Sequence, residues 1–123
     1  MVSDVLYHGA NGDNILKIIH TGVMVPSGDG KIWFARYKWD SALMHGGDAR
    51  RRASFVIKVR VKIPDTAVRR YTTTQGVNDT LEVGTGQPLA AEVLEMHMRT
   101  AGDFVFRHFV GAEFIKSFLG PLP

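Results

Sequence analysis

A histidine followed by a glycine, His8-Gly9, stands at the end of the short apolar run Val5-Leu6-Tyr7, which predicts a first strand. Because glycine has no Cβ, it lets a flat ring approach the backbone closely. An imidazole beside such a gap can hold a polar ligand. A buried imidazole in a capped turn is the structural alternative, and an isolated His-Gly pair would favour that alternative.

The residues that follow resemble the opening of the ADP-ribosyltransferase superfamily. There, a strand that ends in His-Gly precedes a helix that ends in glycine and an apolar residue, as Leu6-Tyr7-His8-Gly9 precedes the segment from Asn14 to Gly22 in this chain. In the diphtheria-toxin-like branch, the histidine bonds a ribose hydroxyl of NAD and backbone groups at the glycine pair with the nicotinamide amide. The resemblance implies these roles for His8 and Gly9.

The segment from Ile32 to Ala42 resembles the family's aromatic strand, which leads into a helix and whose rings sandwich the nicotinamide. Phe34 stands where toxin relatives often have tyrosine, and His45 stands near the second aromatic position. Arg36 is similar to a basic residue that handles NAD in DNA-modifying toxins of the DarT type, and a planar guanidinium can grip a pyrophosphate. Core packing of the rings and a solvated strand end for the arginine are the alternatives. The NAD-binding residues implied by the resemblance are Tyr7, His8, Gly9, Trp33, Phe34, Arg36, Tyr37 and His45.

The family normally supplies a carboxylate at the start of a late strand, where a fixed negative charge stabilises the oxocarbenium-like sugar formed when nicotinamide leaves. Asp103 ranks first, because the stretch from Ala101 to Val110 resembles the DarT-type segment and a closing element still follows it. Its shorter side chain departs from the usual glutamate. Glu113 resembles the glutamate in the Val-Glu-Tyr-Ile of diphtheria toxin, and Glu92 is a third candidate on a predicted helix. The non-catalytic alternatives are that Asp103 is a turn or cap residue after Gly102 and that Glu113 is a solvated residue after the last strand.

The elements that must position these residues are a mixture of strands and helices. The clearest strand runs from Phe55 to Ile63, where apolar and basic residues alternate with period two and point Lys58, Arg60 and Lys62 to solvent. The other expected elements are strands at 5–7, 32–35 and 104–110, a helix capped by Asp13 or Asn14 and ended by Gly22, a helix from Tyr37 or Asp40 to His45, a loop from Thr72 to Gln87, a helix from Pro88 to Gly102, and a core-closing group of Phe114, Ile115 and Phe118.

Composition limits the remaining possibilities. The chain has 123 residues, a formal net charge of +3, no cysteine and five scattered histidines, so we expect one domain over residues 1–123 with no disulfide and no metal site. Its apolar runs are short and Met1-Val2-Ser3-Asp4 does not begin a signal peptide, so we expect a soluble, cytoplasmic protein with no membrane partner. Delivery into a target cell by a dedicated secretion system, or as part of a larger parent chain, stays open. The positive charge is compatible with a phosphate-bearing partner, but a solvated surface that keeps the domain soluble is the favoured interpretation of the charge alone.

These observations predict an α+β domain, and the resemblance implies two small, roughly perpendicular antiparallel sheets around an NAD cleft. The expected activity is mono-ADP-ribosyl transfer from NAD, as substrate, to a macromolecule by a toxin or effector domain, with nucleic acid slightly favoured over protein and a cognate inhibitor or immunity protein as a further partner. The catalytic candidates are His8, Arg36, Asp103 and Glu113. Three alternatives stay open: a small antibiotic-modifying ADP-ribosyltransferase; an RNA 2′-phosphotransferase, which shares this fold and NAD but needs no catalytic acid; and a non-catalytic module that binds nucleic acid through Lys58, Arg60 and Lys62.

Overall fold

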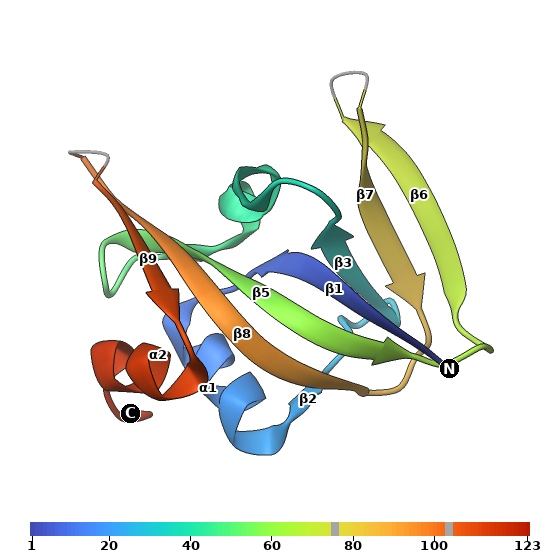
Figure 1. The fold of residues 1–123 in the computed structure, drawn as a ribbon, viewed down its shortest axis with the longest axis horizontal. Coiled ribbons are helices and arrows are strands. Elements are labelled where there is room, and N and C mark those ends of the chain that lie inside the picture. The colour runs from blue at the N-terminus through green and yellow to red at the C-terminus, as the bar shows by residue number, and fades with distance from the viewer. Residues whose placement is uncertain (75–76, 103–104) are drawn as a thin grey trace.

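The computed structural model describes residues 1–74, 77–102 and 105–123, which form an antiparallel sheet with helices on both of its faces (Figure 1). The α+β class expected from the sequence is confirmed. None of the helices in these ranges is long and apolar enough to cross a membrane. The elements are β1 (Val2–Gly9), α1 (Gly12–Thr21), β2 (Val23–Met24), β3 (Lys31–Ala35), the 3-10 helix η1 (Trp39–His45), β4 (Gly47–Asp48), β5 (Ala53–Ile63), β6 (Val68–Thr74), β7 (Val77–Gly84), β8 (Leu89–Thr100), β9 (Phe106–Val110) and α2 (Ala112–Leu119).

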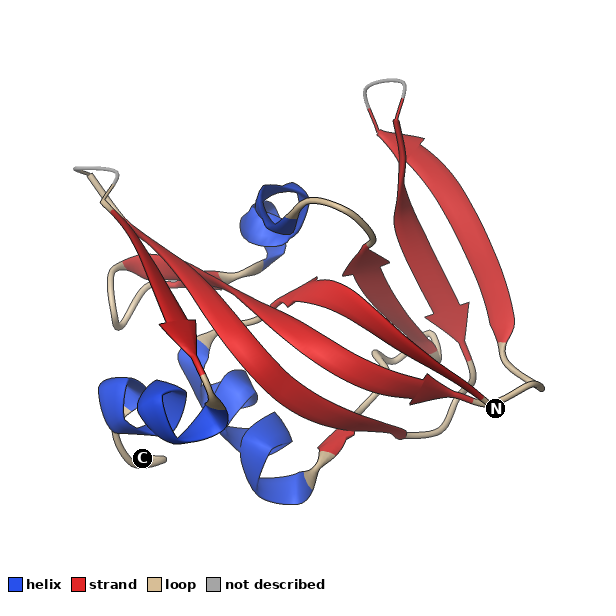
Figure 2. Cartoon of the chain, viewed as in Figure 1, coloured by secondary structure: helices blue, strands red, loops and turns tan. Residues whose placement is uncertain are grey.

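The sheet consists of two parts that meet at a single residue pair. Its strand order is β2-β8-β5-β1-β3-β7-β6, with β4 also paired to β5 and β9 to β8. Whereas β1 pairs with β5 from Val2 to Gly9, its pairing with β3 is limited to Tyr7 and Ala35. Figure 2 shows that the hairpin of β6 and β7 rises steeply beside the strands β1, β5 and β8. The two parts therefore run in clearly different directions.

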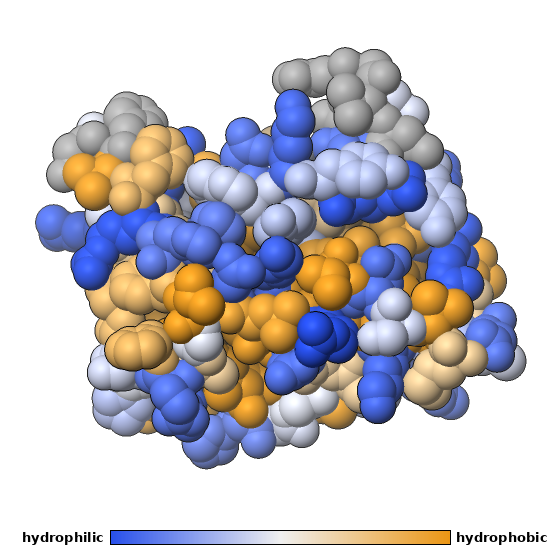
Figure 3. All heavy atoms as spheres, viewed as in Figure 1, coloured by the Kyte–Doolittle hydropathy of each residue, from blue (hydrophilic) through white to orange (hydrophobic). Residues whose placement is uncertain are grey.

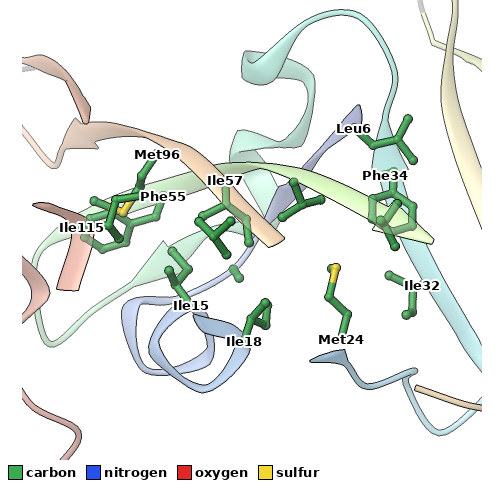
Figure 4. Close-up of a cluster of buried hydrophobic side chains, with 14 of the residues drawn as sticks. Leu6, Ile15, Ile18, Met24, Ile32, Phe34, Phe55, Ile57, Met96 and Ile115 are labelled. Atoms are coloured by element: carbon green, nitrogen blue, oxygen red, sulfur yellow. The ribbon is translucent and has the colours of Figure 1, made fainter. Parts of the chain in front are cut away.

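The main core lies between the sheet and the two α-helices. Every second side chain of β5, from Ala53 to Ile63, points into this core, and α1 packs against the same face with Ile15, Leu16 and Ile18 (Figure 4). Each buried aliphatic side chain of this size contributes about 1.5–3 kcal/mol to stability. A smaller cluster on the opposite face lies under η1 and consists of Ala35, Ala42, Leu43 and Val56, with Tyr7, Trp33 and Trp39 packed against it.

Helix α1 follows the sequence pattern, apart from its first residue. The Asn11 side chain caps it by accepting a hydrogen bond from the Asn14 backbone N–H at 2.9 Å, so the expected caps at Asp13 and Asn14 are wrong by two or three residues. Gly22 ends the helix as predicted, with a left-handed φ of 71° and an N–H that donates to the Ile18 carbonyl. The helix that carries one wall of the site is thus defined at both ends by local sequence.

The helix predicted from Pro88 to Gly102 is wrong, because this stretch forms β8, which pairs with β5 on the side opposite to β1. Its leucine, alanine, glutamate and methionine residues favour helices, but tertiary pairing outweighs that preference. A β-bulge hides the strand pattern, because Leu94 is an extra residue between the pairs Val59–Val93 and Lys58–Glu95. The buried positions therefore change phase at the bulge and imitate a helical period; they are Leu89, Val93, Met96 and Met98.

The loop predicted from Thr72 to Gln87 is also wrong over most of its length. β6 extends to Thr74 and β7 runs from Val77 to Gly84, while residues 75–76 lie outside the described ranges. Leu81 and Val83 are buried and pair with β3, opposite Phe34 and Ile32. The two apolar positions were too few to reveal the strand among threonine, glycine and asparagine residues, although threonine itself suits strands.

The C-terminal segment follows the prediction in part. The expected strand is β9, shortened to Phe106–Val110, and α2 comes after it. Ile115 is fully buried as expected, but Phe114 is 72% exposed and Phe118 is 38% exposed, so these two rings do not close the core. On a helix only one face meets the sheet, and Ile115 and Leu119 occupy that face at a spacing of four residues.

We expect Gly46→Ala to lower the free energy of unfolding by about 1–3 kcal/mol or more, as measured by urea denaturation. A Cβ at Gly46 would collide with the backbone carbonyl of Phe55 and lie 3.0 Å from the Phe55 nitrogen, and backbone atoms cannot turn aside as a side chain can. Gly47→Ala is the matched control, since its Cβ would meet nothing within 4 Å. Equal stability of the two variants would contradict this account of η1 packing.

Candidate functional site

A cleft of about 530 Å³ opens between the end of β1, one face of α1 and the end of η1, and we call it the His8 cleft. Its volume lies within the range of roughly 300–1,000 Å³ that is usual for small-molecule sites. Three of the residues predicted to bind NAD line it together, namely His8, Gly9 and His45. The structure thus brings together residues from β1 and from the end of η1, which lie far apart in the sequence.

His8 is fixed in one orientation by the neighbouring strand. Its Nδ1 lies 2.8 Å from the Trp33 carbonyl oxygen, and a carbonyl can only accept, so Nδ1 carries a proton. Burial lowers the pKa of His8 and the nearby His45 lowers it further, against the opposing effect of the Trp33 carbonyl. The ring is therefore neutral near pH 7, and its Nε2 is a hydrogen-bond acceptor.

Gly9 has a structural role that the sequence did not indicate. A Cβ at this position would collide with the Ala42 carbonyl oxygen and lie 2.9 Å from the His45 carbonyl carbon. The backbone of η1 therefore occupies the space that the missing side chain leaves. This close contact sets the position of His45 at the mouth of the cleft.

The aromatic residues divide between the cleft and the core. The Trp33 ring contacts the His45 ring, with 4.4 Å between centroids and a tilt of 54°. Phe34 is fully buried, and its ring centroid lies 5.7 Å from that of His8. Phe34 therefore supports the imidazole from the core. His45 lines the cleft, whereas Trp33 contacts His45 but packs with the cluster on the opposite face and does not line the cleft.

The wall formed by α1 carries polar residues that were not selected from the sequence. Asn14, Lys17 and Thr21 all line the cleft. They are three and four positions apart, which places them on one face of a helix. That spacing beside a predicted His-Gly strand end was the signal that could have identified them.

Other predicted site residues lie away from the cleft. The Tyr7 side chain packs on the opposite face of the sheet, near the His97 ring. The Arg36 guanidinium lies 4.7 Å from the ring centroid of Tyr37 and 4.6 Å from that of Tyr71. Neither Tyr7, Arg36 nor Tyr37 is among the residues that line the His8 cleft.

The candidate acids are not brought to the cleft within the described residues. Glu113 is exposed in the first turn of α2, forms an ion pair with Lys116 at 2.8 Å and lines a separate pocket. Glu92 is on a strand and not on the predicted helix, where it forms an exposed ion pair with Arg60 at 2.7 Å. Asp103 lies outside the described residues. Of the lining residues that the structure describes, none is acidic.

A buried carboxylate fixes the end of the cleft at the α1 N-terminus. Asp48 accepts hydrogen bonds from the Gly12 N–H at 2.9 Å and from the Arg51 guanidinium at 2.9 Å. Arg51 also donates to Asp13 and to the Leu119 carbonyl oxygen. Burial alone would raise the pKa of Asp48, but the hydrogen bonds from Gly12 and Arg51 outweigh it and lower the pKa. Nothing in the sequence pattern had singled out this group.

Comparisons with known proteins do not name a relative. No protein-family model, curated protein or solved structure matches this chain. The functional argument therefore rests on the geometry of the site and on the residue types in it.

We expect the stability of the protein to depend on pH through His8. Its pKa is below the ordinary value of 6.5 in the folded state, so the unfolded chain binds more protons there and the free energy of unfolding falls as pH drops below that value. The side-chain amide in His8→Asn can still donate to the Trp33 carbonyl but does not titrate. The fall in the free energy of unfolding from about pH 7.5 to about pH 5.5 should therefore be smaller in this variant than in wild type. His97 has a lowered pKa as well and supplies the remaining slope.

Urea denaturation at a series of pH values measures this effect. The control is His20→Asn, because His20 is an exposed histidine on α1. Parallel pH dependence of wild type and His8→Asn would contradict a buried, neutral His8.

Proposed function

We propose that this protein binds NAD in the His8 cleft and transfers its ADP-ribose to an acceptor. The observation that carries the proposal is the convergence of His8, Gly9 and His45, three positions to which the family resemblance assigns NAD, in one cleft of suitable volume. Lys17 adds a positive charge to the same cleft. A cleft with one fixed imidazole and one ammonium group suits a ligand with ribose hydroxyls and phosphates.

The tautomer of His8 determines its role toward the dinucleotide. Because Nδ1–H donates to the Trp33 carbonyl, Nε2 is free to accept a hydrogen bond from a ribose hydroxyl. The ammonium of Lys17 and the side chains of Asn14 and Thr21, on the opposite wall, bind the diphosphate. The His45 ring, which contacts the Trp33 ring, offers a π face to the nicotinamide ring.

Asp103 is the proposed acid of this reaction, and β8, the strand that precedes it in the chain, ends beside β4. Ala101 lines a pocket together with Gly47, and Gly47 also lines the His8 cleft. The division of the sheet into two parts at the Tyr7–Ala35 pair also suits the split sheet of the proposed family. A carboxylate at the cleft would stabilise the positive charge that develops on the ribose as nicotinamide departs.

A second candidate function, NAD-dependent removal of a 2′-phosphate from RNA, is favoured by one specific observation. The ionisable residues that line the cleft, within the described part of the chain, are His8, Lys17 and His45. This set is basic, and a 2′-phosphotransferase needs no catalytic acid. A phosphate acceptor is already anionic and attacks the ribose without a general base.

The non-catalytic alternative has less support. Lys58 and Arg60, two of the three strand cations assigned to nucleic acid, form ion pairs with Glu95 and Glu92. These glutamates lower the positive electrostatic potential of this face, and phosphate groups would have to displace them to reach the two cations.

We expect wild-type protein to bind NAD in isothermal titration calorimetry, with a dissociation constant raised about tenfold in His8→Ala and in Lys17→Ala. The reason is the loss of one hydrogen bond or one phosphate contact, each worth roughly 1–1.5 kcal/mol. His20→Ala, at an exposed histidine on the same helix as Lys17, should bind like wild type. If wild type fails to bind NAD, or if all four proteins bind alike, the His8 cleft is not the site.

Nicotinamide release distinguishes the two candidate reactions. For ADP-ribosyl transfer, Asp103→Asn should lower turnover by about 10²–10³-fold with little effect on NAD affinity. Glu113→Gln and Glu92→Gln should release nicotinamide at the wild-type rate. For the phosphotransferase, all three variants should keep NAD-dependent removal of an internal 2′-phosphate from a short RNA. Labelled NAD offered separately to protein, RNA and DNA then identifies the acceptor of the first reaction.

A further inference from the structure

Two imidazoles and a carboxylate meet on the face of the sheet opposite the His8 cleft. His97 on β8 lies directly across from His108 on β9 in the strand register, and Glu95 precedes His97 by two residues on the same face. One ligand atom from each of the three lies within 4.8 Å of the others. Figure 3 shows hydrophilic and hydrophobic side chains side by side over β8 and β9.

We propose that Glu95, His97 and His108 bind a divalent transition-metal ion, with Zn²⁺ as the best fit. Two imidazole nitrogens and one carboxylate oxygen are typical zinc ligands, whereas Mg²⁺ and Ca²⁺ prefer oxygen alone. Three protein ligands leave a fourth tetrahedral position for water. This inference is independent of NAD binding, because none of the three residues lines the His8 cleft.

The backbone already provides the spacing that such a site needs. Directly opposed residues of an antiparallel pair have Cβ atoms roughly 4.5–5.5 Å apart, and a residue two positions away on the same strand lies on the same face. With metal–ligand distances of about 2.0–2.2 Å, tetrahedral ligand atoms are about 3.3–3.6 Å apart. The atoms of the three residues therefore need to approach by little more than an ångström, which side-chain rotation supplies.

Metal binding requires one ring to turn. The His97 and His108 rings are stacked, with 4.3 Å between centroids and 5° between planes. A metal ion lies in the plane of each imidazole that binds it, and two parallel planes share no point. His108 is the ring that turns, because its side chain is 47% exposed. Its hydrogen bond to Glu95, 2.6 Å long, is then replaced by two bonds to the metal.

The surroundings prepare the other two ligands. The Trp39 ring is stacked on His97, with 4.6 Å between centroids and 3° between planes, and it holds the imidazole in place. Lys58 donates to Glu95 across 3.2 Å, which orients the carboxylate but also places a competing positive charge beside the ion.

Zinc titration of the metal-free full chain tests the proposal. Isothermal titration calorimetry should show one saturable site, and His97→Ala or His108→Ala should weaken it at least about tenfold. His20→Ala is the matched control and should bind zinc like wild type. Co²⁺ should give the intense visible absorption of a four-coordinate ion in wild type but not in His108→Ala.

Two further variants separate this site from adventitious binding to surface histidines. Lys58→Met removes the competing ammonium and should tighten zinc binding several-fold, an effect that a lone surface histidine would not show. In Trp33→Phe, Trp39 is the remaining tryptophan of the two in the chain, so zinc should change its fluorescence as the His97–His108 stack opens. Equal zinc affinity of wild type, His108→Ala and Lys58→Met would overturn the proposal, as would the absence of saturable binding.

Discussion

The buried carboxylate of Asp48 is the group on which the arrangement of the His8 cleft depends. It accepts the Gly12 N–H at the start of α1 and the guanidinium of Arg51, which in turn reaches the Leu119 carbonyl at the end of α2. Two helices are thereby tied to the strand β4, which is only two residues long. Separating the carboxylate from the guanidinium would leave a buried charge without a partner, which is energetically costly, so the pair stays together. This connection holds the polar face of α1 opposite His8.

Strand alternation separates the chemistry of the two faces. Successive side chains of β1 point in opposite directions, so His8 faces α1 while Tyr7 lies on the other side near His97. The resemblance implies NAD-binding roles for both Tyr7 and His8, but the two side chains point to opposite faces of the sheet. The outer face instead carries a row of stacked rings from Trp39 through His97 to His108. The same sheet thus supports two polar sites whose lining residues do not overlap.

The sequence predicted those features that depend on local order. The helix that ends at Gly22, the alternating strand at 55–63 and the His8-Gly9 strand end are all properties of short segments. β8 could not be recognised, because its bulge at Leu94 shifts the buried positions and its composition favours a helix. Asp48 and the pair of His97 with His108 depend on contacts between distant segments, which a single sequence does not reveal.

The β8–β9 hairpin connects the two proposals. Its outer face carries the three proposed zinc ligands, and the N–H of Ala101, directly after β8, donates to the Arg52 carbonyl beside β4. An ion bound by His97 and His108 would hold β9 against β8 in addition to the backbone ladder. The two proposed sites thus lie near the same hairpin, on opposite faces of the sheet.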